Sequence, residues 1–172
     1  MIGTSGSGKS FVARAIANRC GLEYIDNDAI IWRPNWQETP REERPALFDR
    51  ATAGERWVID GNLAGTQPED RLVLARCDTI VWLDLPRREI WPAIAIRTIR
   101  RAWTKEPLFH GNVERWSQVL SRDSMILWSI KTFARRRRAY TKLFAELTGK
   151  IAIELRSRRE VNAWLESLAR RP

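Results

Sequence analysis

"MIGTSGSGKSF", residues 1–11, is the stretch of sequence that decides the expected fold. It contains the pattern Gly-x-x-x-x-Gly-Lys-Ser, with Gly3, Gly8, Lys9 and Ser10 at the fixed positions, which is the spacing of a phosphate-binding loop. Glycines are required because successive backbone N–H groups must turn inward around phosphate oxygens, and side chains there would obstruct that turn. The spacing therefore predicts a nucleotide site.

The residues after the loop support this interpretation. "SFVARAIANRCG" predicts an amphipathic helix over 10–19 that ends at Gly21, whereas a flexible Gly/Ser tail predicts no such helix. Lys9 would reach the β- and γ-phosphates of ATP, and the Ser10 hydroxyl would contact Mg²⁺. The residues expected to bind ATP are Gly3, Thr4, Ser5, Gly6, Ser7, Gly8, Lys9 and Ser10.

Four short apolar runs are typical of buried parallel strands, at 22–26, 57–60, 79–84 and 151–155. Helices are expected over about 40–53, 86–104, 122–147 and 159–169. Strands that alternate with helices predict an α/β fold whose parallel sheet is covered on both faces. Neither a repeat nor a long linker divides the chain, so a single domain over 1–172 is expected.

Two local details qualify this outline. Thr39 is expected to cap the helix over 40–53, and Pro45 is expected to kink it. Only Met1 and Ile2 precede the phosphate loop, which is too short for a full strand. We therefore expect either a natural start a few apolar residues upstream or a truncated first strand.

Composition excludes several classes of protein. The 172 residues are 44% hydrophobic and 30% charged, as in a globular protein. The sequence has neither an apolar run of about 20 residues nor a secretory leader, so a cytoplasmic protein without a membrane partner is expected. Cys20, Cys77 and His110 do not form the pattern of a disulfide framework or a zinc site.

Charge is distributed unevenly along the chain, whose net charge is +9. Residues 87–172 hold 20 of the 30 Lys and Arg residues but only 8 of the 21 Asp and Glu residues. A basic half indicates a polyanionic partner, either nucleic acid or the phosphates of a nucleotide, and charge alone does not choose between them.

A phosphate loop also needs an acidic residue for Mg²⁺ at the end of a neighbouring strand. Asp84 ends the more apolar run, "IVWLD", whereas Asp60 is followed by Gly61 and Asn62, a turn that could face the phosphates. Both aspartates are candidates on pattern alone.

Seven segments of the chain together resemble a known family. They are "GTSGSGKS", "DAIIWRPNW", "TPREE", "WVIDGN", "TIVWLDLPR", "RDSMILW" and "LRSRREVNAWL". In this order and spacing they resemble the P-loop proteins known as DNA topology modulation proteins or adenylate-kinase-like proteins. The resemblance implies the three-layer nucleoside/nucleotide kinase fold, with a five-stranded parallel sheet of order 2-3-1-4-5 and an Arg-rich helical lid, here within about 97–147.

The same resemblance assigns roles to individual residues. It favours Asp60 over Asp84 as the residue near Mg²⁺. It places Asp28, Trp32 and Trp36 in a segment that faces the phosphate acceptor, although tryptophans in a short loop often only cover the edge of a sheet. Asn62, beside Asp60, is a further candidate for contact with the acceptor.

The lid arginines are expected to stabilise the transferred phosphoryl group. Arg97, Arg100 and Arg101 share one helix face by their spacing, whereas the run 135–138 must spread around its helix so that only one or two members could face the site. Arg156 or Arg158 would lie near the adenine.

These patterns favour a monomeric, ATP- and Mg²⁺-dependent phosphotransferase that acts on a small acceptor, with Lys9, Asp60, Arg97 and Arg101 as catalytic residues. Ser10 and Asp60 would hold the metal, largely through water. Two alternatives remain: a nucleic-acid-associated ATP-binding regulator, and a relative that binds nucleotide without catalysis.

Overall fold

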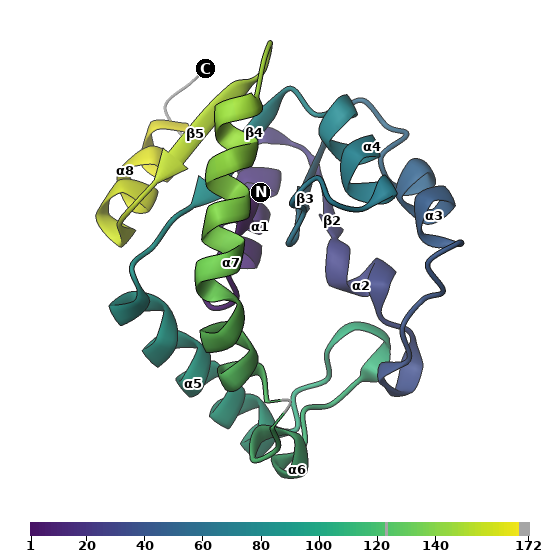
Figure 1. The fold of residues 1–172 in the computed structure, drawn as a ribbon, viewed down its shortest axis with the longest axis vertical. Helices are drawn as coiled ribbons and strands as arrows, with labels where there is room; N and C mark the ends of the chain where they lie inside the picture. The colour runs from purple at the N-terminus through teal and green to yellow at the C-terminus, as the bar shows by residue number, and fades with distance from the viewer. Residues whose placement is uncertain (123, 169–172) are drawn as a thin grey trace.

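Strands and helices alternate along most of the chain (Figure 1). The structure is a computed structural model that describes residues 1–122 and 124–168. Its strands are β1 (Ile2–Gly3), β2 (Glu23–Asp26), β3 (Trp57–Asp60), β4 (Thr79–Leu83) and β5 (Ile151–Leu155). Its α-helices are α1 (Lys9–Cys20), α2 (Asn27–Ile31), α3 (Arg44–Ala51), α4 (Pro68–Arg76), α5 (Arg87–Thr104), α6 (Trp116–Val119), α7 (Met125–Glu146) and α8 (Arg158–Leu168). Two short 3₁₀ turns are η1 (Pro34–Trp36) and η2 (Phe109–Gly111).

The strands form two parallel sheets, one of order β1-β4-β5 and one of the pair β2-β3. Met1 lies where the sheets meet: its amino nitrogen donates to the carbonyl of Ile59 at 2.8 Å, and its own carbonyl accepts from Gly61 at 3.1 Å. The expected parallel α/β architecture is confirmed. One continuous five-stranded ladder is not formed, because β1 has only two paired residues and Met1 alone reaches β3.

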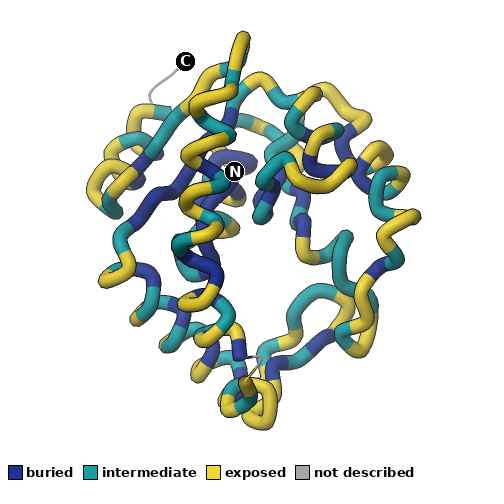
Figure 2. Tube along the Cα trace, viewed as in Figure 1, coloured by how far each residue is buried: buried dark blue, intermediate teal, exposed yellow. Residues whose placement is uncertain are grey.

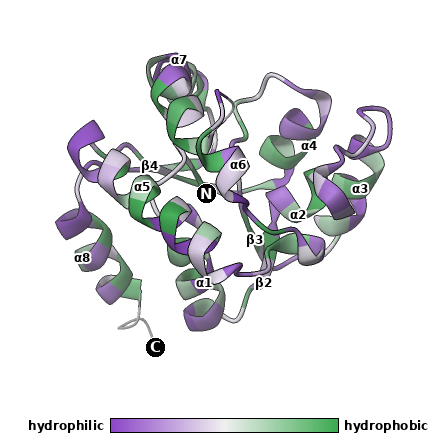
Figure 3. Ribbon diagram, turned by 90° about the horizontal axis from the view of Figure 1, so that it is seen from below, coloured by the Kyte–Doolittle hydropathy of each residue, from purple (hydrophilic) through white to green (hydrophobic). Residues whose placement is uncertain are grey.

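Helices cover both faces of the sheets, and β4 shows why. Val81 and Leu83 pack in one apolar cluster with α1 and α8, whereas Ile80 and Trp82 pack in another with α3, α4 and α7. Alternate residues of a strand point to opposite faces, so β4 is buried on both sides. Figure 3 shows the two groups of helices on opposite sides, and Figure 2 shows buried residues along the strands.

The four strands expected from apolar runs are confirmed within one residue at each end. The expected kink is wrong: α3 begins at Arg44, so Pro45 lies in the first turn, where its missing N–H has no intrahelical partner to lose. Thr39 is not a cap either, because its hydroxyl donates to the carbonyl of Ile30 at 2.8 Å. Pro92 lies inside α5, which continues to Thr104.

Some elements differ from the sequence-based outline. The helices α2, α4 and α6 were not expected: α2 begins directly after β2, α4 follows residues 61–67 after β3, and α6 is a single short turn. The helix expected over 122–147 begins at Met125, where the Ser124 hydroxyl accepts from the backbone N–H of Leu127. Within the described residues, no helix has the length and apolar character needed to cross a bilayer.

Candidate active site

The phosphate loop, residues 3–8, leads from β1 into the N-terminus of α1. Gly6 and Gly8 have φ angles of 85° and 91°, which side chains rarely adopt, and a Cβ at Gly6 would lie 2.9 Å from the carbonyl oxygen of Ile90. The hydroxyls of Thr4 and Ser7 are buried and find no hydrogen-bond partner among the residues that the structure describes. The first turn of α1 contains no acidic residue, so its positive end can bind an anion.

Burial and nearby carboxylates and guanidinium groups together set the pKa of Lys9. Burial lowers the pKa of its ammonium group to about 8, while Asp60 and Asp28 act to raise it and Arg97 to lower it. The ammonium donates to the carbonyl of Thr4 at 3.3 Å. A triphosphate beside Lys9 would favour the charged form, so the lysine is suited to bind one.

Asp60 and Asp84 have different environments. Asp60 is 4% exposed at the end of β3, and one of its carboxylate oxygens accepts from the Tyr24 hydroxyl at 3.2 Å. Both carboxylate oxygens of Asp84 accept from Arg137 of α7, at 2.8 to 3.0 Å. Asp84 therefore joins α7 to the end of β4 by a bidentate ion pair.

A cavity of about 780 Å³ opens beside the loop. The predicted site residues among its lining residues are Ser5, Lys9, Ser10, Asp28, Trp32, Trp36, Asp60, Asn62, Arg97 and Arg101. The structure thus brings together residues from the loop, from the ends of β2 and β3, and from α5. Asp84 and Arg100 are absent from the lining.

The residues expected to hold Mg²⁺ fit that role. Ser10 and Asp60 both line the cavity, and a hydroxyl with a carboxylate is a donor set of the oxygen type that Mg²⁺ prefers. Asn62 also lines the cavity, and its buried side-chain oxygen has no hydrogen-bond partner within residues 1–122 and 124–168. These oxygens could accept from water molecules around the ion.

Acidic side chains gather where β2 and β3 end. Asp26 caps α2, since its carboxylate accepts from the backbone N–H of Asp28 at 3.0 Å. Burial raises the pKa of Asp26, and the charges of Asp60 and Asp28 raise it further. The negative charge at this end of the sheet favours a cation, and Lys9 supplies one.

Basic side chains face this cluster from α5. Burial lowers the pKa of Arg97, and the charge of Arg101 adds to that effect. Arg101 pairs with Glu114 at 3.5 Å, and burial raises the pKa of Glu114. Within the described residues Arg97 forms no ion pair, and its buried Nε has no hydrogen-bond partner.

The structure divides the predicted arginine cluster of α5. Arg100, expected beside Arg97 and Arg101, instead pairs with Glu106 at 3.1 Å, and its side chain is 63% exposed. Positions 97 and 101 lie closer in angle around the helix than either lies to 100. Of these three arginines of α5, Arg97 and Arg101 line the cavity and Arg100 does not.

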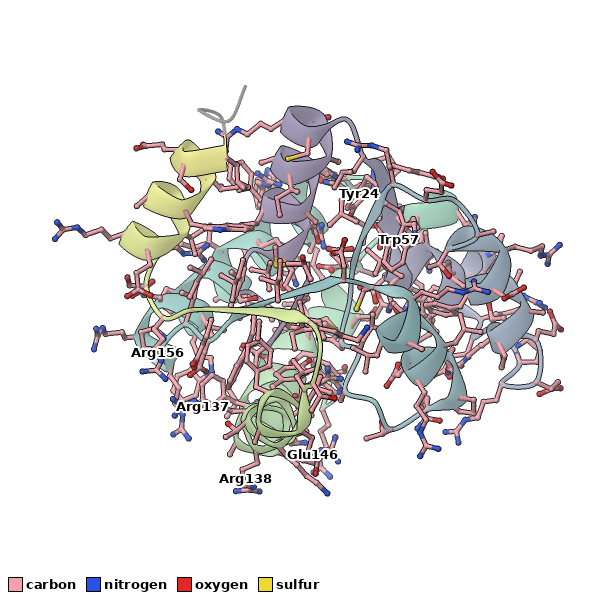
Figure 4. All side chains as sticks on the ribbon, turned by 90° about the horizontal axis from the view of Figure 1, so that it is seen from above. Tyr24, Trp57, Arg137, Arg138, Glu146 and Arg156 are labelled. Carbon is pink, nitrogen blue, oxygen red and sulfur yellow. The ribbon has the colours of Figure 1, made fainter. Side chains whose placement is uncertain are left out.

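The basic run of α7 contributes to packing around the site. Arg136 lies over the Trp128 ring at 4.5 Å, and Arg137 binds Asp84. Arg135 and Arg138 are exposed, and Figure 4 shows Arg138 pointing away from the sheets. None of the four lines the cavity.

Arg156, between β5 and α8, and Arg158, the first residue of α8, have different partners. Arg158 lies against the phosphate loop, where it donates to the carbonyl of Gly6 at 3.4 Å. Arg156 pairs with Glu154 and points to solvent, as Figure 4 shows. Arg158 is thus the member of this pair that contacts the phosphate loop.

Sequence reasoning missed several residues of the site. Tyr24 contacts Asp60, Arg14 stacks on the Tyr24 ring at 4.9 Å, and Glu114 pairs with Arg101. The alternation of β2 was a usable signal for Tyr24, because Tyr24 and Asp26 share one side of that strand. No local signal marked Glu114, since its role depends on a loop that folds back onto α5.

Known proteins are similar in sequence to part of this chain. No protein-family model matches it. A shikimate kinase of Symbiobacterium thermophilum is 31% identical over 96 residues, which cover 49% of this chain and 55% of that protein. Shikimate kinases of Halorhodospira halophila and Nitratidesulfovibrio vulgaris are 33% and 32% identical over 98 residues, which cover 50% of this chain and 55% and 56% of those proteins.

The chain thus spans about half the length of the curated relatives it matches. The parallel α/β architecture and the phosphate loop agree with this partial similarity. The DNA topology modulation name receives no support from these relatives. The similarities support a P-loop nucleotide-kinase-like family for this chain.

Proposed function

We propose that this protein is an ATP- and Mg²⁺-dependent phosphotransferase that phosphorylates a small molecule. The observation that carries the proposal is the cavity in which Lys9, Asp28, Asp60 and Arg97 lie together beside the phosphate loop. Kinases transfer a phosphoryl group mainly by positioning and by electrostatic stabilisation, and this cavity supplies charges of both signs. The similarity to shikimate kinases, which covers about half of the chain, supports the same type of reaction.

Each residue has a role in this reaction. The loop N–H groups and Lys9 bind the phosphates of ATP, and Ser10 and Asp60 would hold Mg²⁺, largely through water. Mg²⁺, when bound, neutralises charge on the phosphates. Asp28 accepts the proton of the acceptor hydroxyl as its oxygen bonds to the γ-phosphorus and the bond to the ADP oxygen breaks. Arg97 and Arg101 stabilise the negative charge on the transferred group.

The charges of the cavity also indicate the class of acceptor. Arg97 is partly buried without an ion pair, which costs free energy that a bound anion would offset. Asp28 faces the same cavity and can orient a hydroxyl. We infer an acceptor with a hydroxyl or phosphate that receives the phosphoryl group and with an anionic carboxylate or phosphate that Arg97 can bind. Nucleoside monophosphates, as in adenylate-kinase-like enzymes, and hydroxy acids both meet this description.

Several finer features belong to the same proposal. The two hydrogen bonds of Met1 support a functional sheet of order 2-3-1-4-5, with β1 between β3 and β4. Residues 1–172 would act as one domain, with the lid within about 97–147 closing over the triphosphate. We propose a monomer that works in the cytoplasm.

The experiment is a screen for acceptor-stimulated ADP release from Mg·ATP. Acceptors would be nucleosides, nucleoside monophosphates and hydroxy carboxylic acids. Lys9→Ala should lower the stimulated rate by about 100-fold or more, because it removes the positive charge that stabilises the transferred phosphoryl group. Lys142→Ala is the matched control, since Lys142 is exposed on α7 and pairs with Glu146, one turn away on the same helix. Unchanged turnover in Lys9→Ala would contradict the proposal.

A second candidate function rests on the outer surface of α7. Arg135 and Arg138 are exposed there and do not belong to the cavity, so a nucleic-acid backbone could contact them. A nucleic-acid-associated regulator would bind a DNA duplex with steep salt dependence. Titration of a duplex at two salt concentrations measures this directly. ATP binding without turnover would indicate the non-catalytic alternative.

A further inference from the structure

Asn112 joins two segments that are distant in sequence. It is 4% exposed, and its side-chain oxygen accepts from the backbone N–H of Trp36 at 2.9 Å. Its side-chain nitrogen donates to the carbonyls of Arg33 and Phe109, both at 3.0 Å. Two of these three bonds join the acceptor segment, residues 28–38, to the loop after α5, residues 105–114, and the bond to Phe109 holds the amide within that loop.

Further contacts connect the same segments. The indole N–H of Trp36 donates to the carbonyl of Val113 at 3.2 Å, and the His110 ring lies 2.8 Å from the carbonyl oxygen of Ala29. The Trp36 ring packs edge to face on Phe109 at 5.6 Å. We name this junction the clasp: Ala29, Arg33 and Trp36 on one side, and His110, Asn112 and Val113 on the other.

The backbone of the clasp is held in an unusual conformation. Asn35, Trp36 and His110 have φ angles of 61°, 58° and 57°, in the left-handed region. A bulky residue such as Trp is rare there, and such conformations persist only where surrounding contacts determine them. The bond from the Trp36 N–H to Asn112 is one such contact, so the clasp imposes the local shape of the acceptor segment.

The clasp lies at the acceptor end of the cavity. Asp28, Trp32, Trp36 and Phe109 line the cavity, while Asn112 lies behind this wall. Figure 1 shows the chain between α5 and α6 reaching across to the segment after α2, so that the two close a ring. Separation of these segments would open the acceptor end of the cavity to water.

We propose that Asn112 is a positioning residue that holds the acceptor segment against the loop after α5 and thereby keeps bulk water away from the transferred phosphoryl group. This rests on the proposed function, since water exclusion matters only for phosphoryl transfer. The clasp favours transfer to the acceptor over hydrolysis because water is the competing nucleophile. The contacts form between groups of the chain alone, so the acceptor end is shaped before an acceptor binds.

The test combines amide hydrogen exchange with a leak assay. In Asn112→Ala the Trp36 amide should exchange about tenfold faster, because its acceptor is removed. ADP release from Mg·ATP without any acceptor should rise several-fold, while the dissociation constant for ATP stays within about twofold. Asn162→Ala, an exposed asparagine on α8, is the matched control and should change none of these.

A second variant keeps the test decisive if Asn112→Ala fails to fold. His110→Ala removes only the exposed contact with the carbonyl of Ala29 and should shift both readouts in the same direction by less. Unchanged exchange at Trp36 in both variants would overturn the clasp. Faster exchange with an unchanged leak would overturn its role in excluding water. The exchange measurement needs no turnover, so it decides the clasp even if the chain fails the acceptor screen.

Discussion

The two ends of the cavity are built in different ways. At the phosphate end, backbone groups of residues 3–8 and the start of α1 make the site from one short stretch of sequence. At the acceptor end, side chains from the segment after β2 meet a loop about 80 residues further along the chain, as in the bond from the Trp36 N–H to Asn112. The phosphate end is therefore a local structure, and the acceptor end depends on tertiary packing. The following predictions separate the two ends, from the largest expected effect to the smallest.

Asp28 belongs to the acceptor end and should affect chemistry without affecting nucleotide binding. Asp28→Asn should lower kcat for the best acceptor by about 100-fold, because the amide cannot take a proton from the acceptor hydroxyl. The dissociation constant for ATP, measured by calorimetry, should stay within about twofold. A large loss of ATP affinity would instead assign Asp28 to the phosphate end.

Arg97 and Arg100 form a matched pair on one helix. Arg97→Met should raise KM for an anionic acceptor by about tenfold, because a charged hydrogen-bond donor is lost from the cavity. Arg100→Met should leave KM within about twofold, since Arg100 is exposed and pairs with Glu106. Steady-state kinetics with both variants measures this split. Equal effects would mean that the cavity does not distinguish the two arginines.

The ion pair of Arg137 and Asp84 tests which strand-end aspartate serves the metal. Arg137→Ala should lower the free energy of unfolding by about 1–3 kcal/mol, because it leaves a buried carboxylate without its donor. Arg138→Ala, an exposed neighbour, should change it by less than about 0.5 kcal/mol. Urea unfolding gives both values. ATP binding to Arg137→Ala, measured with and without Mg²⁺, is the second readout. If Arg137→Ala keeps its stability but ATP binding no longer depends on Mg²⁺, Asp84 rather than Asp60 would lie near the metal.

The pH dependence of stability reports on Lys9. Its pKa is about 8 in the ligand-free fold against 10.5 for an ordinary lysine, because burial disfavours the charged form. Between these values the unfolded chain binds more protons at this position, so the contribution of Lys9 to the free energy of unfolding rises with pH. The free energy of unfolding of the wild-type chain minus that of Lys9→Met should therefore increase from pH 8 toward pH 10.5. Urea unfolding across this range measures it, and a flat or falling difference would contradict the assigned burial.

Local patterns explain how much of the fold could be predicted. The loop, the helix after it and the four apolar strands depend on nearby residues, and the structure contains them. The start of α3 was placed too early, because Thr39 resembles a helix cap in sequence but is used by a contact with Ile30. One continuous sheet was expected from the family pattern, whereas the two-residue β1 gives two sheets that meet at Met1.

The candidate site shows the same division. Lys9, Ser10, Asp60 and Arg97 were singled out by spacing or by resemblance, and they line one cavity. Arg100 was grouped with them because helical spacing alone does not show which side faces the site. Asn112 and Glu114 could not be found, because no motif links them to their partners. Asn112 donates to Arg33, 79 residues away, and Glu114 pairs with Arg101 only because a loop folds back onto α5.

The most direct test of the account follows the phosphoryl group itself. ³¹P NMR of Mg·ATP with the wild-type chain and the acceptor chosen by the screen should show a new phosphate-ester or phosphoanhydride signal that grows as fast as ADP appears. Inorganic phosphate should remain a minor product. Release of inorganic phosphate alone with every acceptor, or no loss of ATP, would contradict the claim that one cavity joins a nucleotide site to an acceptor site.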